Sequence, residues 1–172
     1  GHVARFLGDG VLAYFGYPRA HEDDAERAVR AGLDALEAVG RLRSPLGAPL
    51  AARVGIATGL VVVGDLIGQG AIQEQAVVGD TPNLAARLQA LAEPGTLVVA
   101  APTRRLLGEL FELADLGPVE AKGFAGPLTA FQVVGEGRAH GRFEALRGAA
   151  GTKLIGREPE LRTLMERWQL AR

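Results

Sequence analysis

Apolar residues recur along the chain with two periods, every second residue in some stretches and every third or fourth in others. Alternation, short apolar runs and the turn signals between them predict strands at 2–7, 11–15, 50–59, 60–67, 96–100, near 111–116 and near 129–134. The helical period predicts helices at 21–43, from 82 to the stop at 93–95, at 102–109, and from 159 onward. This order predicts an α+β fold, a ferredoxin-like sheet with helices packed on one face.

The helix that starts near residue 81 carries two polar side chains one turn apart. Thr81 is expected to cap it and Pro82 to be its first residue. An apolar stripe on this helix should face the core: Leu84, Leu88 and Leu91. Asn83 and Arg87 stack beside that stripe. Together they could hold an anionic or charge-developing group, or they could be a solvated pair bonded to nearby carbonyls.

Two further polar residues are candidates for chemistry. Asp9 lies in Gly8-Asp9-Gly10 between two predicted strands, which is a hairpin signal. It is either a turn residue in a left-handed conformation or an oxygen ligand for a divalent cation. Lys122 lies in a predicted loop, where it is either a solvated surface charge or a phosphate ligand.

Composition and charge exclude several classes of protein. The 172 residues are 48% hydrophobic and 23% charged, which is typical of one globular domain. The net charge of −1 gives no basic field for nucleic acid or an anionic membrane. No apolar run reaches the roughly 18 residues of a membrane span. Without cysteine there is no disulfide or thiolate metal site, and the cytoplasm is the expected location.

The chain divides into three parts by composition. Residues 1–134 hold the predicted sheet, 135–152 lose apolar periodicity and are interpreted as a linker, and 153–172 begin another unit. Because the chain opens without Met inside a strand pattern, we expect it to be cut from something longer at both ends.

Three motifs in order, RFLGDGVLAYFG, RVGIATG and VVGDTPNLAARL, resemble the class III adenylyl/guanylyl cyclase catalytic domain over residues 1 to about 134. The resemblance implies the fold of that family without its first strand. The stretch LIGREPELR at 154–162 resembles the opening of an ATPase domain found after such cyclase domains in large bacterial regulators.

The resemblance also implies a reaction and a set of roles. A nucleoside triphosphate is cyclised with loss of pyrophosphate, with two divalent cations, Mg²⁺ or Mn²⁺, held on two aspartates. Asp9 matches the second aspartate, Asn83 the residue that orients the ribose, Arg87 the residue that stabilises the α-phosphate, and Lys122 a terminal-phosphate contact. The family works as a head-to-tail homodimer with shared sites.

Three departures bear on these roles. The first metal aspartate belongs to a strand before residue 1, so this chain alone is expected to be inactive. The two base-selecting positions hold Arg5 and Ala76, and Ala76 has no side-chain group to read a base. The expected function is cyclisation of ATP, with GTP left open, in intracellular signalling. The alternative is a degenerate domain that senses nucleotide or dimerises to regulate a downstream ATPase.

Overall fold

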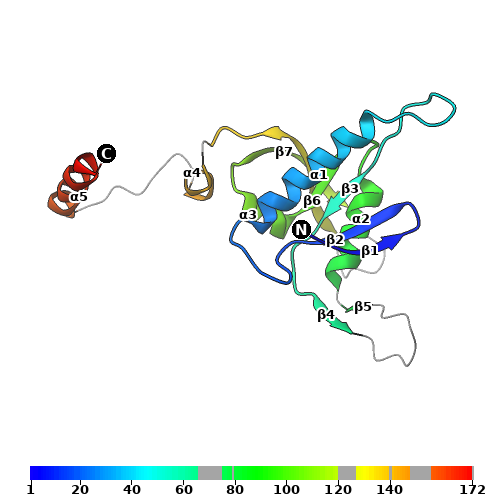
Figure 1. Ribbon diagram of the computed structural model, residues 1–172, viewed down its shortest axis with the longest axis horizontal. Helices are drawn as coiled ribbons and strands as arrows, with labels where there is room; N and C mark the ends of the chain where they lie inside the picture. The colour runs from blue at the N-terminus through cyan, green and yellow to red at the C-terminus, as the bar shows by residue number, and fades with distance from the viewer. Residues whose placement is uncertain (66–74, 79, 120–126, 140, 148–155, 172) are drawn as a thin grey trace.

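The structure is a computed structural model that describes residues 1–65, 75–78, 80–119, 127–139, 141–147 and 156–171 (Figure 1). The strands are β1 (His2–Leu7), β2 (Gly10–Tyr14), β3 (Val54–Ile56), β4 (Val62–Asp65), β5 (Gln75–Val78), β6 (Leu97–Ala100), β7 (Phe111–Val119) and β8 (Leu128–Glu136). The helices are α1 (Asp24–Gly40), α2 (Asp80–Leu91), α3 (Ala101–Leu107), α4 (Arg142–Arg147) and α5 (Glu158–Leu170).

The described strands form one four-stranded sheet and two separate strand pairs. The sheet has the order β3-β6-β8-β7, in which β3 and β6 run parallel and the other neighbours antiparallel. The pairs β1–β2 and β4–β5 are antiparallel. The predicted α+β class is therefore confirmed.

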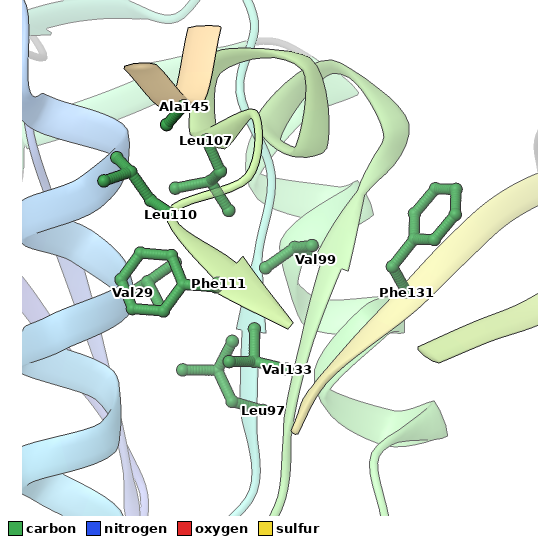
Figure 2. Packing of buried hydrophobic residues seen from close by; sticks show 9 residues of the cluster. All are labelled: Val29, Leu97, Val99, Leu107, Leu110, Phe111, Phe131, Val133 and Ala145. Carbon is green, nitrogen blue, oxygen red and sulfur yellow. The ribbon is translucent and has the colours of Figure 1, made fainter. Parts of the chain in front are cut away.

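Two apolar clusters lie on opposite faces of this sheet. Leu97 and Val99 of β6 belong to the cluster under α1, α3 and α4, part of which is drawn in Figure 2. Val98 and Ala100 of the same strand belong to the cluster under α2. Since successive strand residues point to opposite faces, α2 covers the face that α1 leaves open. The expectation that all helices share one face holds for α1, α3 and α4 and is wrong for α2.

Helix α2 begins at Asp80, so Thr81 lies inside the helix and is not its cap. The Thr81 hydroxyl instead donates a hydrogen bond of 3.0 Å to the carbonyl oxygen of Leu60. Of the predicted apolar stripe, Leu84 is partly buried, Leu88 is 1% exposed and Leu91 is 39% exposed.

The stretch interpreted as a linker contains more structure than its composition indicates. Strand β8 extends to Glu136, and α4 follows with Ala145 buried in the core. The Glu109 amide donates a 3.1 Å hydrogen bond to the carbonyl oxygen of Ala145, which fastens α4 to the body. The last helix, α5, begins near Pro159 as predicted and has no buried residue.

Candidate functional site

Asp9 sits at the tip of the β1–β2 hairpin, where Leu7 pairs with Gly10. Gly8 takes the left-handed conformation, with φ of +63°, and no described residue other than glycine has a positive φ. Glycine at the first central position fits a type II′ hairpin turn. Because Gly8 supplies the unusual backbone, the turn does not require aspartate at position 9. The left-handed backbone at Gly8 therefore does not account for an aspartate at position 9, whose side chain is exposed at the tip of the hairpin.

Helix α2 packs closely on β3 at Gly55. A Cβ built at this glycine would lie 2.2 Å from both the carbonyl oxygen of Ala85 and the amide nitrogen of Gln89. Both are backbone atoms of α2, so only glycine allows the helix this close to the strand. Sequence reasoning missed this role, although a glycine inside a strand pattern often marks a close backbone approach.

The N-terminal end of α2 is held by the residues that follow β3. A Cβ at Gly59 would lie 2.5 Å from the hydroxyl of Thr81, the group that bonds to Leu60. One residue earlier, the Thr58 hydroxyl bonds at 2.9 Å to that of Thr103, which is fully buried in α3. The RVGIATG motif thus fixes where α2 starts and how close it lies.

Asn83 and Arg87 are presented on this fixed helix, one turn apart. The Asn83 side chain is exposed and that of Arg87 is partly buried. Within the described ranges, neither side chain forms a hydrogen bond or ion pair with Asp9, nor with the carbonyl groups of neighbouring loops. The described residues therefore give no support to the interpretation that this pair is bonded to nearby carbonyl groups. The Asn83 amide and the Arg87 guanidinium both remain available to a ligand.

The structure places two of the other base-selecting and site positions, Arg5 and Ala76, on strands. Arg5 is partly buried in β1 and pairs with Leu12 of β2. Burial raises the pKa of the nearby Tyr14, and the positive charge of Arg5 partly opposes that rise. Ala76 lies in β5 opposite Gly64, and Lys122 lies outside the described residues.

The described cavity does not gather the candidate residues that the structure places. A cavity of about 560 Å³ lies between β2, α1, β3 and the start of α2, but Asp9, Arg5, Asn83 and Arg87 do not line it. Among the residues placed by the structure, no cluster of three or more potential metal ligands occurs. Asp9 fits one position in a magnesium site, since carboxylate oxygens suit that ion, but further ligands must come from elsewhere.

No helix within the described part of the chain has the length and apolar content needed to cross a bilayer.

Comparison with known proteins identifies the family. The model of the adenylate and guanylate cyclase catalytic domain matches residues 4–135. Adenylate cyclase 1 of Rhizobium meliloti (strain 1021) is 34% identical over 151 residues, which are 84% of this chain and 23% of the relative. The chain spans between 16% and 31% of the length of the first curated relatives it matches.

Two solved structures share the fold. The adenylyl cyclase CyaB from P. aeruginosa has a TM-score of 0.70 and 30% identity, covering 82% of this chain and 75% of that one. The guanylate cyclase domain of RhGC from Catenaria anguillulae, solved in complex with GTP, has a TM-score of 0.72 and 27% identity, covering 78% and 72%. The matched residues include both the Asp9 hairpin and the α2 pair. This chain belongs to the adenylate and guanylate cyclase catalytic domain family.

Proposed function

We infer that this chain is the catalytic part of a longer protein that converts ATP to a 3′,5′-cyclic nucleotide and pyrophosphate for signalling inside the cell. The observation that carries this proposal is the pair of ready donors on α2. Asn83 and Arg87 lie on α2, which is held close to β3 by backbone contact at Gly55. Among the described residues, no neighbour forms a hydrogen bond or ion pair with either side chain. A helix edge built only for stability has no need of that arrangement.

In the proposed reaction the ribose 3′-oxygen loses its proton and bonds to the α-phosphorus. The bond from that phosphorus to the oxygen bridging to the β-phosphate breaks, and pyrophosphate leaves. Arg87 would donate to the α-phosphate oxygens as their charge grows, which is where a preorganised donor lowers the barrier. The Asn83 amide would hydrogen-bond the ribose and align its 3′-oxygen.

Asp9 would hold divalent metal together with an aspartate outside this chain. When bound, Mg²⁺ or Mn²⁺ supplies positive charge that stabilises the phosphates and favours ionisation of the attacking hydroxyl. The exposed position of Asp9 on a two-residue turn leaves its carboxylate open to such an ion.

The same arrangement supports a homodimer. Asp9 and the α2 pair make no contact within the described part of one chain, and they carry complementary parts of one chemistry. A head-to-tail dimer would join Asp9 of one protomer to Asn83 and Arg87 of the other, which gives two sites related by symmetry. The 172-residue chain tested alone should then make no product, because Asp9 matches the second metal aspartate and the first is not in this chain.

ATP is the proposed substrate, and the names of two relatives as adenylyl cyclases support it. A degenerate, regulatory domain is the second candidate, and one observation favours it: position 76 on β5 carries alanine, which has no group to read a base. Lys122 would contact the terminal phosphates, and Arg5 would act as a positive donor near the base.

The test is production of cyclic nucleotide by the longer protein, with ATP and GTP supplied separately in Mg²⁺ and in Mn²⁺. Arg87→Ala should lower kcat by about 100-fold or more, the loss typical of one transition-state donor. Asn83→Ala should also lower kcat. Gln89→Ala and Arg105→Ala, at exposed positions on α2 and α3, are the matched controls and should retain activity.

Removing metal with EDTA should abolish product. Absence of product from a folded dimer under every condition would overturn the catalytic proposal and favour the regulatory one.

A further inference from the structure

Helix α4 is too short to be stable without the rest of the domain. It spans six residues, Arg142–Arg147, whereas isolated helices shorter than about 12–15 residues are marginal in water. Its helical form therefore depends on docking against the body of the domain. Because helix formation and docking are then one event, α4 has two states, a docked helix and an undocked coil.

The docked state is built around the end of α3. The Ala145 side chain is 3% exposed and lies in the core cluster with Leu107, the last residue of α3 (Figure 2). The Glu109 amide donates its hydrogen bond to the carbonyl oxygen of Ala145. A Cβ built at Gly108 would lie 2.3 Å from that same oxygen, so only glycine allows α4 to come this close. Undocking of α4 would therefore uncover the end of α3.

Helix α3 connects this contact to the start of α2. Thr103 and Leu107 lie one turn apart on α3, and both are fully buried. The Thr103 hydroxyl bonds at 2.9 Å to that of Thr58. The next residue, Gly59, lies against α2, since a Cβ there would come within 2.5 Å of the Thr81 hydroxyl. Because packed interiors are nearly incompressible, a shift of α3 reaches α2 through these contacts.

We propose that docking of α4 regulates the candidate site by fixing α3 and, through the hydroxyl bond between Thr103 and Thr58, the N-terminal end of α2. With α4 docked, α2 presents Asn83 and Arg87 in the position described above. With α4 undocked, α3 loses its cover and the start of α2 is no longer fixed. A partner that binds only the undocked segment would therefore lower activity. The effect on activity rests on the proposed function, whereas the effect on α2 does not.

Proline at position 146 tests whether α4 has two states. Leu146 is 49% exposed, so its replacement leaves the core cluster in place. Proline removes a helical hydrogen bond and clashes with the carbonyl group four residues earlier, whereas Leu146→Ala keeps the helix and is the matched control. The Glu109 amide reports docking, because its partner is on α4. Hydrogen exchange of the 172-residue chain, followed by NMR, should show this amide exchanging at least about 10-fold faster in Leu146→Pro than in Leu146→Ala.

The amides from Leu84 to Leu88 report the response of α2 in the same experiment. They should also exchange at least about 10-fold faster in Leu146→Pro, while the amides of β6 keep their protection and show that the domain remains folded. A Glu109 amide that stays protected would overturn the proposal, and so would unchanged exchange in α2. An equal loss of protection in β6 would also overturn it, because the effect would then be a general loss of stability.

Cyclase activity of the longer protein tests the consequence for the site. Leu146→Pro should lower kcat by at least about 10-fold, and Leu146→Ala should retain activity. Thr103→Val removes the hydroxyl bond that carries the coupling. In that background Leu146→Pro should lower kcat by less than about 2-fold further.

Independent, multiplicative losses from Thr103→Val and Leu146→Pro would contradict the coupling, because α4 would then act by another route. Absence of product from the unaltered longer protein would contradict only the proposed function, since hydrogen exchange measures the coupling without a substrate.

Discussion

Replacing Gly55 with alanine tests whether close packing of α2 on β3 positions the candidate site. The added Cβ would lie 2.2 Å from two backbone atoms of α2, and ordinary contact begins near 3.4 Å. Restoring that separation requires the helix to move by the difference, about 1.2 Å. Backbone atoms cannot turn aside as a flexible side chain would, so the whole helix has to shift.

Two effects of this shift can be measured separately. Overpacking of this kind costs about 1–3 kcal/mol, so urea unfolding of Gly55→Ala should show a lower midpoint. Displacement of Asn83 and Arg87 by about 1 Å should reduce cyclase activity of the longer protein by about 100-fold, even where the variant is fully folded.

Gly135→Ala is the matched control for this prediction. Gly135 is also a strand glycine, but a Cβ there meets no atom within 4 Å. Alanine at this position should leave the unfolding midpoint and the activity nearly unchanged. If Gly55→Ala were as stable and as active as Gly135→Ala, the account of how α2 is positioned would be wrong.

Further predictions concern stability. Leu88→Ala should lower the free energy of unfolding by about 2–5 kcal/mol in urea titrations, because this side chain is 1% exposed. Leu60→Ala, at a residue 94% exposed, should change it by less than about 0.5 kcal/mol, and equal losses would contradict the assigned core. Tyr14→Phe should raise the free energy of unfolding of the 172-residue chain by about 1 kcal/mol, because described residues give the buried Tyr14 hydroxyl no partner. Burial raises the pKa of Tyr14, so ionising this hydroxyl costs more in the folded chain than in the unfolded one; the free energy of unfolding does not depend on this group well below the unfolded value near 10, and it falls as pH rises from there through the folded pKa. Thermal unfolding against pH should therefore show a decline above about pH 10 that Tyr14→Phe reduces, and an unchanged decline would contradict the assignment.

Much of the fold could be predicted because local patterns decide it. The β1–β2 hairpin follows from alternating apolar residues around Gly8-Asp9, and the structure places Asp9 at its tip. Strand β6 was expected from an apolar run and is buried throughout. The polar pair on α2 was predicted from a four-residue spacing, which any helix places on one side.

Other features could not be predicted because they depend on contacts between distant segments. Periodicity shows which side of α2 is apolar but not which face of the sheet will receive it. The role of Gly55 depends on how closely Ala85 approaches, which is thirty residues away in sequence. Helix α4 was missed because it spans only six residues, RFEALR, too few for a periodic signal, in a stretch rich in glycine, arginine and alanine.

Subunit mixing tests the central claim, a cyclase site shared between two protomers, most directly. Asp9→Asn and Arg87→Ala of the longer protein should each be inactive as homodimers. Mixing equal amounts under exchange conditions should restore about a quarter of wild-type activity, since half the dimers are mixed and each has one intact site. No recovery from mixed dimers that have demonstrably formed, or full activity of either variant alone, would contradict the claim.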